Sequence, residues 1–416
     1  MKKVWILNLV LFLITPLLKA NCGDRYLTPV FADVNITKDI QYGSAKKSNG
    51  ITQDLLMDIY EPQGDTLALR PLIIYMHGGS FFGGDKNVAE ASLICMEFAK
   101  RGYVAVSIDY RLENNPLVLA FPEIMIKAVM RAVQDSKAAV RYFRKDYAEN
   151  ENVWRINPSE IFLGGASAGA ITALHHAYMD DFNELEEDYQ HYVNLLGGME
   201  GNSGNPGYSS WVKAVVNVSG CIRDQDYMNN NKTIPIYSMH SVGDLTIPYG
   251  YGFPYFIPTL PIVAGSRQIH ERTDSLGMNA LFISLPGNVH VPYKDGDMPL
   301  QPGWDTLWNT LPAFLYQFLS CNPDYISVGV IQNYQAEEVQ LYPNPTTDIL
   351  ILKDYLKLNG TFAYEILDNN GKVITEGNQL PEQLNIKNLN ISSGIYFLHI
   401  IDTKENHHKI GRFIVK

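Results

Sequence analysis

The sequence has little positive charge, and its basic residues are scattered. Lys and Arg number 33 against 44 Asp and Glu, which gives a formal net charge of −11, and no basic stripe is visible along the chain. Binding to nucleic-acid phosphates needs clustered Lys and Arg. A nucleic acid is therefore not an expected partner, and the negative charge favours solubility.

Long apolar runs are also scarce. The only extended one covers residues 4–18, behind Lys2 and Lys3 and shortly before Ala20. A positive start, a short apolar run and a small residue before cleavage predict a signal peptide at residues 1–20 rather than a membrane span. We expect no stable membrane span elsewhere in the chain.

The chain has only four cysteines, and export would allow them to form disulfides. Four cysteines permit three complete pairings, and their spacing does not choose among them. Cys95 lies in an apolar helical run and is expected to be a buried free thiol. Cys22 begins the mature chain and Cys321 ends the large domain, so a bond between them is one hypothesis. A lipoprotein signal acylated at Cys22 is the alternative, although Asn21 stands where that signal requires a small residue.

From about residue 31 onward, short β-rich runs alternate with stretches of helical spacing. Several runs are apolar throughout, which is typical of strands buried on both faces of a sheet. The sequence predicts an α/β domain with one eight-stranded, mostly parallel, doubly wound sheet. Helices are expected at Val88–Lys100, Leu117–Asp146, from Ala168, and at Trp304–Ser320, and strands at Val34–Tyr42, Leu55–Tyr60, Pro71–Met76, Tyr103–Ile108, Ile161–Gly164, Ala214–Ser219, Ile234–His240 and Ala280–Leu285.

Two stretches interrupt this alternation. Residues 181–211 are acidic and then rich in Gly, Asn and Ser, whereas residues 249–265 are aromatic and rich in proline. Both follow strand ends, which is where an open α/β sheet binds its ligands. Each is therefore either a lid or substrate wall, or a solvated surface loop.

The character of the chain changes after Cys321. Residues 322–338 have the composition of a linker, and residues 339–416 show short alternating strands between turn signals such as Asn344-Pro345. This predicts a small, sandwich-like all-β domain after a catalytic domain at residues 21–321. The small domain lacks a set of residues that would give it chemistry of its own.

The centre of the functional argument is Gly165-Ala166-Ser167-Ala168-Gly169, which follows a predicted strand and opens a predicted helix. Small residues on both sides of a serine permit the sharp turn that lifts its hydroxyl above the sheet. The helix N-terminus adds positive potential at the same place. We predict Ser167 as a nucleophile; the alternative is a glycine-rich turn in which the serine only caps the helix.

A second motif, His77-Gly78-Gly79-Ser80-Phe81-Phe82-Gly83-Gly84, follows another buried strand. Acyl transfer places negative charge on the carbonyl oxygen of the substrate, and closely held N–H groups stabilise it. Gly78, Gly79 and Ala168 are the expected oxyanion hole, and His77 is expected to orient the loop. Aromatic residues in this loop and in the second insertion are predicted to bind the substrate: Phe81, Phe82, Tyr249, Tyr251, Phe253 and Tyr255.

A serine nucleophile needs a histidine base, and the histidine needs a carboxylate that fixes its tautomer. In this type of sheet the chain order is serine, acid, histidine. Asp244 and His290 each follow a predicted strand and complete that order. The rival acids are Asp224 and Asp226, and the rival bases are His240 and His270.

Together, the His-Gly-Gly loop, the Gly-Ala-Ser-Ala-Gly turn, Asp244 and His290 resemble the carboxylesterase branch of the α/β hydrolases, over about residues 35–320. Tyr110-Arg111 and Asp135 also resemble that branch. Ala166 before the serine is similar to the type-B form, whereas an Asp as the acid departs from it, because that group often uses Glu. Some type-B relatives lost the serine and became adhesion domains, so the presence of Ser167 favours catalysis.

The C-terminal segment has a resemblance of its own. Leu341-Tyr342-Pro343-Asn344-Pro345-Thr346, Gly394-Ile395-Tyr396-Phe397 and Arg412-Phe413-Ile414-Val415-Lys416 are similar to the C-terminal sorting domain of the type IX secretion system of Bacteroidetes. The resemblance implies the type IX secretion machinery as a partner and export through the periplasm and outer membrane, to the cell surface or beyond. The alternative is a carbohydrate-binding β-module.

The expected function is that of a secreted serine carboxylesterase that works through an acyl-enzyme and needs no metal or cofactor. The absence of Cys-x-x-Cys and His-x-x-x-His patterns agrees with this. The alternatives are a serine peptidase and a surface binding protein on an inactive hydrolase scaffold. Candidate esters are acetylated or feruloylated polysaccharides, short-chain lipids and polyesters, and the sequence does not choose among them.

Overall fold

The structure is a computed structural model that describes residues 22–114, 121–296, 298–322 and most of 337–416, the last without residues 340, 353–361, 369–372, 378, 382, 390 and 403–407. The predicted signal peptide, residues 117–120 of the second predicted helix and most of the predicted linker lie outside the described residues.

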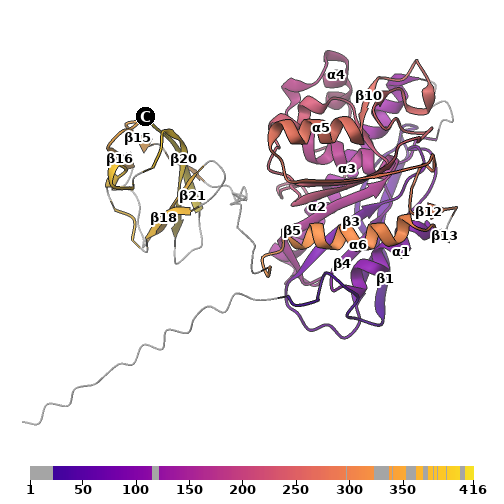
Figure 1. The fold of residues 1–416 in the computed structure, drawn as a ribbon, viewed down its shortest axis with the longest axis horizontal. Coiled ribbons are helices and arrows are strands. Elements are labelled where there is room, and N and C mark those ends of the chain that lie inside the picture. The colour runs from indigo at the N-terminus through magenta and orange to yellow at the C-terminus, as the bar shows by residue number, and fades with distance from the viewer. Residues whose placement is uncertain are drawn as a thin grey trace, which may run out of the picture.

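An eight-stranded sheet forms the centre of the first part of the chain (Figure 1). Six strands run parallel, and two antiparallel strands extend one edge. The prediction of a mostly parallel sheet is confirmed. In spatial order the strands are β1 (Val34–Lys46), β2 (Thr52–Pro62), β4 (Val104–Ile108), β3 (Arg70–Met76), β5 (Ile156–Ala166), β6 (Ala214–Val218), β8 (Ile236–Ser241) and β11 (Ala280–Leu285).

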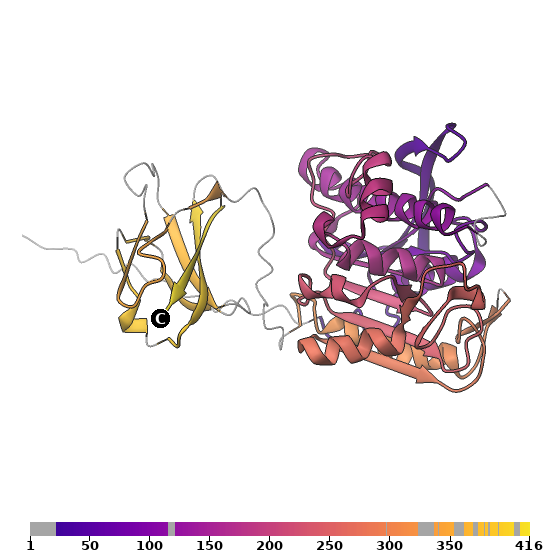
Figure 2. The same ribbon diagram turned by 90° about the horizontal axis from the view of Figure 1, so that it is seen from above.

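Helices cover both faces of this sheet (Figures 1 and 2). Successive side chains of a strand point to opposite faces. In β3, Leu72 and Ile74 accordingly pack into one core with the second, third and fifth helices, whereas Ile73 and Tyr75 pack into another core with the first and sixth. The sheet is doubly wound, as predicted. The helices are α1 (Ala89–Lys100), α2 (Pro122–Glu149), α3 (Ala168–Tyr178), α4 (Glu187–Leu195), α5 (Ser266–Leu276) and α6 (Gly303–Tyr316).

The two predicted insertions are held in place by different contacts. Residues 197–205 are held on α2, where Lys137 and Arg141 pair with Glu200 at 2.9 and 2.5 Å. The segment 249–265 forms a small three-stranded sheet of β9 (Tyr251–Gly252), β10 (Val263–Gly265) and β7 (Cys221–Ile222). The second insertion is therefore tied to the chain directly after β6. Minor elements are β12 (Lys294–Asp295), β13 (Met298–Pro299) and the 3-10 turns η2 (Phe182–Glu184), η3 (Gln225–Asn229) and η4 (Pro254–Phe256).

A disulfide joins Cys22 to Cys321, while Cys95 and Cys221 are buried free thiols. Both expectations for these cysteines are confirmed. Because the Sγ atom of Cys22 is used in this bond, it cannot carry a lipid thioether at the same time.

The C-terminal segment has a core of its own, made by residues between Val339 and Val415. As predicted, its described elements are almost entirely strands, arranged in a five-stranded and a three-stranded sheet. They are β14 (Glu337–Glu338), β15 (Leu341–Tyr342), β16 (Ile349–Leu352), β17 (Phe362–Asp368), β18 (Val373–Gly377), β19 (Gln383–Asn385), β20 (Gly394–Asp402) and β21 (His408–Val415), with the 3-10 turn η6 (Lys387–Leu389).

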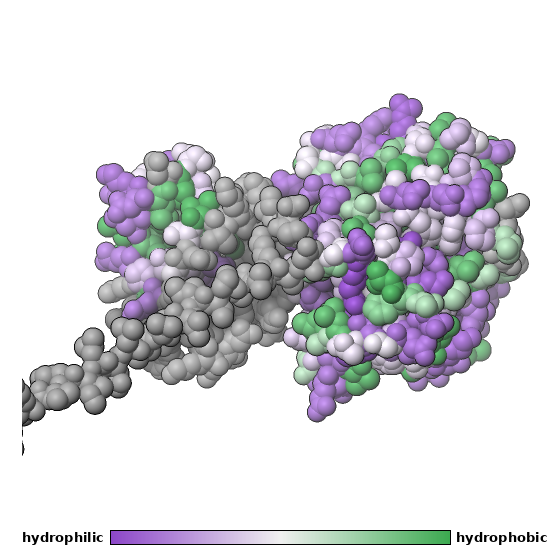
Figure 3. Space-filling model, turned by 60° about the horizontal axis from the view of Figure 1, so that its bottom comes forward, coloured by the Kyte–Doolittle hydropathy of each residue, from purple (hydrophilic) through white to green (hydrophobic). Residues whose placement is uncertain are grey.

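The face of the molecule drawn in Figure 3 intersperses hydrophobic residues with hydrophilic ones. Within the described part of the chain, none of the helices combines the length and apolar character needed to cross a bilayer.

Candidate active site

Ser167 lies in a sharp turn between β5 and α3. Its φ of 54° and ψ of −118° place it in the left-handed half of backbone space, which is strained for a residue with a side chain. Its N–H donates to the carbonyl of Val218 at 2.9 Å, and its carbonyl accepts from Ile171 at 2.9 Å, so β6 and α3 hold the turn. The strained turn presents the hydroxyl at the edge of the sheet.

The glycines of the motif are needed because β3 passes very close to this turn. A Cβ on Gly165 would lie 2.5 Å from the carbonyl oxygen of Met76, and one on Gly169 would lie 2.1 Å from the same atom. Neither distance is sterically possible for a real side chain. The spacing of the two glycines around Ser167 therefore follows from the packing of this turn on β3.

The structure brings Ser167, His290 and Asp244 together from three separate strand ends. The Nε2 atom of His290 lies 2.8 Å from the Oγ atom of Ser167, and its Nδ1 atom lies 2.7 Å from Oδ2 of Asp244. In this arrangement the Nδ1–H group donates to the carboxylate, and Nε2 is left to accept the serine proton. The His290 side chain is a quarter exposed, which keeps it accessible to a substrate.

Asp244 is fully buried, and four hydrogen bonds hold its carboxylate. Oδ1 accepts from the backbone N–H groups of Thr246 and Ile247 at 2.7 and 3.2 Å, and Oδ2 accepts from His290 and from Nε2 of His240 at 3.0 Å. Burial alone would raise the pKa of Asp244, but the hydrogen bonds from the two histidines and the backbone outweigh it and lower the pKa to about 2. The carboxylate therefore stays charged at any ordinary pH.

His240 does not contact Ser167; it lies on the far side of the acid. Its ring is fully buried, and Nδ1 lies 2.8 Å from the Oγ atom of Ser266, which in turn accepts from Asn217 at 3.0 Å. The residue considered above as a rival base is thus a second partner of Asp244. Its position four residues before the acid was the only sequence signal for this contact.

The other rivals have structural partners. Asp224 caps η3 by accepting from the N–H of Asp226 at 2.9 Å, and Asp226 pairs with Arg272 at 2.7 Å. His270 stacks on Phe282 with ring centroids 4.7 Å apart, and burial lowers the pKa of His270 to about 4.

Two of the predicted oxyanion donors, Gly78 and Ala168, adjoin the nucleophile. An ideal Cβ on Gly78 would be 3.2 Å from Cβ of Ser167, so the glycine loop passes directly beside the serine. Among the described residues, we find no hydrogen bond that uses the N–H of Gly78, Gly79 or Ala168. Ala168 is the first residue of α3, where backbone N–H groups have no partner within the helix. These three N–H groups are available to a substrate oxygen.

Buried side chains that follow β4 hold the glycine loop in place. Tyr110 stacks on His77 at 4.5 Å and donates to the His77 carbonyl at 2.8 Å. The next residue, Arg111, pairs with Asp135 of α2 at 2.8 Å. Burial lowers the pKa of His77, so its ring is neutral, and it lies 2.6 Å from the Gly78 carbonyl. His77 orients the loop through this contact.

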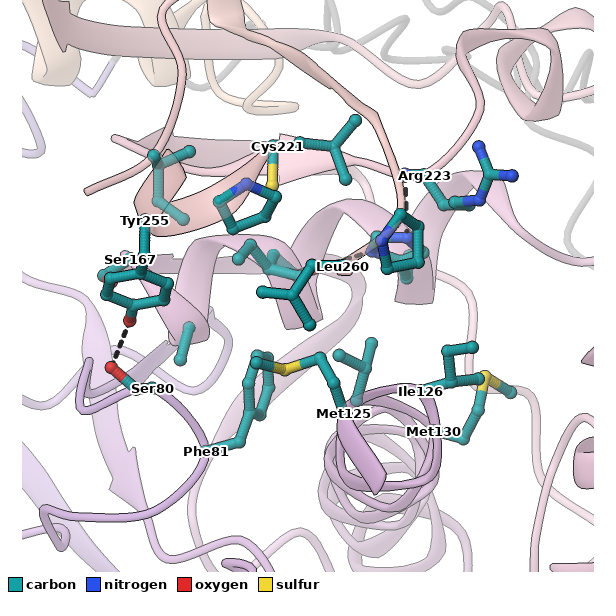
Figure 4. Close-up of a pocket in the computed structure, with 18 of the residues that line it drawn as sticks. Ser80, Phe81, Met125, Ile126, Met130, Ser167, Cys221, Arg223, Tyr255 and Leu260 are labelled. Carbon is teal, nitrogen blue, oxygen red and sulfur yellow. Dashed lines mark hydrogen bonds between the residues drawn. The ribbon is translucent and has the colours of Figure 1, made fainter. Parts of the chain in front are cut away.

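An apolar pocket of about 710 Å³, its open mouth included, begins at Ser167. In Figure 4, Ser167, Ser80 and Tyr255 lie toward one end of the pocket and Arg223 toward the other. Arg223 is held by Glu186 and by the hydroxyl of Tyr189, at 3.1 Å for the latter. The wall between these ends is almost entirely apolar, with contributions from Phe81, Met125, Ile126, Val129, Met130, Ile171, Met179, Ile247, Leu260, Pro261 and Val263.

Two of the six aromatic residues predicted to bind the substrate line this pocket. Phe81 and Tyr255 do, and the Tyr255 hydroxyl is hydrogen-bonded to Ser80 of the glycine loop. Tyr249 instead stacks on Phe282. The remaining three, Phe82, Tyr251 and Phe253, are also not among the residues that line the pocket.

The pocket walls also contain residues that the sequence did not single out. Met125, Val129 and Ile171 lie at helical spacing on α2 and α3, where an apolar face predicts packing against the core. Tyr189 of the first insertion lines the pocket as well. Sequence alone offered no signal that separates such residues from ordinary core residues.

In comparisons with known protein families, two segments of the chain match a family model. Residues 57–240 match the family model described as BD-FAE, an α/β-hydrolase esterase family, and residues 340–416 match the secretion system C-terminal sorting domain. A comparison with curated proteins gave no match.

Similar solved structures include esterase 2 of Thermogutta terrifontis in several states. The paraoxon-phosphorylated form is 20% identical, covers 68% of this chain and 94% of its own, and has a TM-score of 0.49. The propionate-bound form is 21% identical, with coverages of 68% and 93% and a TM-score of 0.46. The native form is 22% identical, with coverages of 69% and 91% and a TM-score of 0.43.

Proposed function

Since the chain carries a BD-FAE esterase domain of the α/β-hydrolase fold at residues 57–240 and a type IX sorting domain at residues 340–416, we propose that it is a secreted serine carboxylesterase. The sorting domain indicates export to the outside of the cell. The observation that carries the chemistry is the continuous contact from the Ser167 hydroxyl through His290 to Asp244, at 2.8 and 2.7 Å.

In the proposed reaction, Ser167 attacks the carbonyl carbon of an ester while His290 takes its proton. The N–H groups of Gly78, Gly79 and Ala168 hold the charged oxygen that forms. The imidazolium then protonates the leaving alcohol, and an acyl-enzyme remains. Water activated by the same histidine releases the acid and restores the serine.

The pocket supports esters with an apolar acyl group. The polar side chains at its two ends are paired with protein atoms: Ser80 with Tyr255, and Arg223 with Glu186 and Tyr189. A hydrocarbon chain between them would leave no buried polar group without a partner. We therefore propose aliphatic carboxylic esters as the substrate class.

Labelling with a fluorophosphonate tests the nucleophile. The wild-type protein should be labelled and Ser167→Ala should not, because the reagent needs a serine activated by a base. Hydrolysis of p-nitrophenyl esters of increasing acyl length, with a p-nitroanilide beside them, then separates an esterase from a peptidase. Failure of the wild type to label or to hydrolyse any ester would favour a binding protein on an inactive scaffold.

A further inference from the structure

Apolar side chains are exposed around the mouth of the pocket as well as inside it. Five of them carry exposed fractions between 40 and 66% and belong to the loops that bear the proposed catalytic groups or to the second insertion. We call these five residues the apolar rim: Phe82, Val242, Leu245, Phe256 and Val289.

The loops that carry the rim adjoin one another. The N–H of Gly243 donates to the carbonyl of Gly287 at 2.8 Å, which joins the loops of Val242 and Val289. The N–H of Tyr255 donates to the carbonyl of Thr246 at 2.7 Å, which brings Phe256 beside the loop of Leu245. The Ser80–Tyr255 hydrogen bond adds the loop of Phe82. The five side chains thus belong to one connected ring of loops around Ser167.

Charge is missing from this ring in a protein in which 19% of residues are charged. The segments 80–84, 242–247, 249–262 and 286–290 contain no Lys, Arg or Glu, and their one Asp is the buried Asp244; the exposed Asp85 directly follows the first segment. Scattered exposed apolar residues are ordinary on a protein surface, but a connected and uncharged set marks an interaction site.

The ring is also continuous with the pocket. Ser80, Phe81, Ile247 and Tyr255 line the pocket and lie within two positions of rim residues in the chain. The apolar rim and the apolar pocket are therefore connected through neighbouring residues of the same loops. An acidic polymer would find no Lys or Arg in these segments, whereas an apolar ester phase would cover the apolar rim favourably.

We propose that the apolar rim docks this protein on the surface of undissolved acylglycerol, from which an acyl chain enters the pocket. The inference rests on the proposed esterase function and specifies its substrate. A free chain end suits the pocket because Arg223 stands at its far end, tied to Glu186 and Tyr189. The chain of a solid polyester would have to continue beyond that point.

The test compares dissolved and emulsified tributyrin with matched variants of the full chain. Leu245→Ser/Phe256→Ser removes rim residues that are 62 and 66% exposed, and Ile51→Ser/Val153→Ser removes residues away from the ring that are 64 and 62% exposed. The wild type should gain rate above the solubility limit of tributyrin. On the emulsion, the rim double variant should hydrolyse tributyrin about tenfold more slowly than the wild type, while the control double variant keeps the wild-type rate. The wild type and both double variants should hydrolyse dissolved p-nitrophenyl acetate at rates within about twofold of one another.

Flotation of Ser167→Ala protein with tributyrin droplets measures docking without catalysis. Flotation that the rim substitutions abolish supports the inference, even if the wild type hydrolyses no ester and the proposed function fails. Equal behaviour of rim and control variants overturns it while esterase activity on dissolved ester stands. Retention on a polyester film but not on droplets overturns it too, as does a dimer in light scattering that only the rim substitutions dissociate, because a second copy would then cover the rim.

Discussion

The hydrolase part and the C-terminal part of this chain differ most in what they bury. The hydrolase part keeps ionisable groups away from water in pairs and networks, such as Arg111 with Asp135, and His240 with Asp244. The C-terminal part has an apolar core, and among its described residues Thr346 is the one polar residue that is buried.

This difference separates two tasks within one chain. Burying charge costs stability unless geometry and hydrogen bonds compensate, so a domain without chemistry gains little from it. A sorting domain has only to fold and display a surface. We infer that all of the catalytic chemistry lies before residue 323.

Asp244→Asn is expected to lower kcat/KM by about 10⁴-fold. The amide has nearly the same shape, but it cannot hold His290 in the tautomer that leaves Nε2 free to accept a proton. Steady-state kinetics on p-nitrophenyl butyrate measures the loss. Asp226→Asn is the matched control, because its carboxylate pairs with Arg272 at the surface and should leave the rate within about twofold. A comparable loss in both variants would contradict the assignment of the acid.

Acidification is expected to lower kcat/KM by about tenfold per pH unit below the range in which histidines titrate, or about 100-fold over two units. Because the pKa of Asp244 is lowered to about 2, this carboxylate remains charged throughout and does not cause the decline. Asp244 itself favours the folded state above the ordinary pKa of an aspartate, and that contribution disappears only as the pH falls through about 2. A pH–rate profile from pH 4 to 9, with circular dichroism at each point, shows whether activity declines while the fold remains. A flat profile between about pH 5 and 8 would argue against a histidine base.

The sequence predicted the strands and the proposed catalytic residues of this site better than the residues that line its pocket. Several of the strands appeared as short, uniformly apolar runs, and the order of Ser167, Asp244 and His290 at strand ends followed from the topology of a parallel sheet. Strand limits were less accurate: β5 extends from Ile156 to Ala166, whereas the prediction covered Ile161–Gly164. Apart from Ile156, the flanking residues are proline, polar or small residues and carry no apolar signal.

The substrate wall was predicted poorly for a different physical reason. A pocket lined by α2 and α3 shows the same helical apolar spacing as a packed core, so Met125 or Ile171 could not be distinguished from core residues. The aromatic residues of the second insertion were equally ambiguous. Tyr255 faces the pocket and Tyr251 is exposed, because the strands and the 3-10 turn of this segment direct them differently.

His240→Leu is expected to lower kcat by about tenfold. The change removes one hydrogen bond from Oδ2 of Asp244 but leaves the bonds from His290 and from two backbone N–H groups. His240→Gln can still donate to the carboxylate and should retain most of the activity. Steady-state kinetics together with thermal melting separates a role of His240 in positioning Asp244 from a role in folding. Equal melting temperatures with a tenfold difference in kcat between the Leu and Gln variants indicate that His240 positions Asp244. Equal rates in the two variants would mean that His240 only fills space.

Removal of the C-terminal part is expected to have the smallest effect on chemistry. The apolar clusters of the hydrolase part contain only residues up to Cys321, and the third cluster contains only residues from Val339 onward, so neither core needs the other to be complete. A chain that ends at residue 338 should therefore keep kcat/KM on dissolved esters within about twofold, since distant sites are usually energetically independent. The same deletion should prevent export from a host with type IX secretion, because residues 340–416 are the sorting domain. Measuring activity in the cell extract and the medium tests both halves of the comparison at once. A shortened protein that is folded but inactive would show that the C-terminal part contributes to the active site.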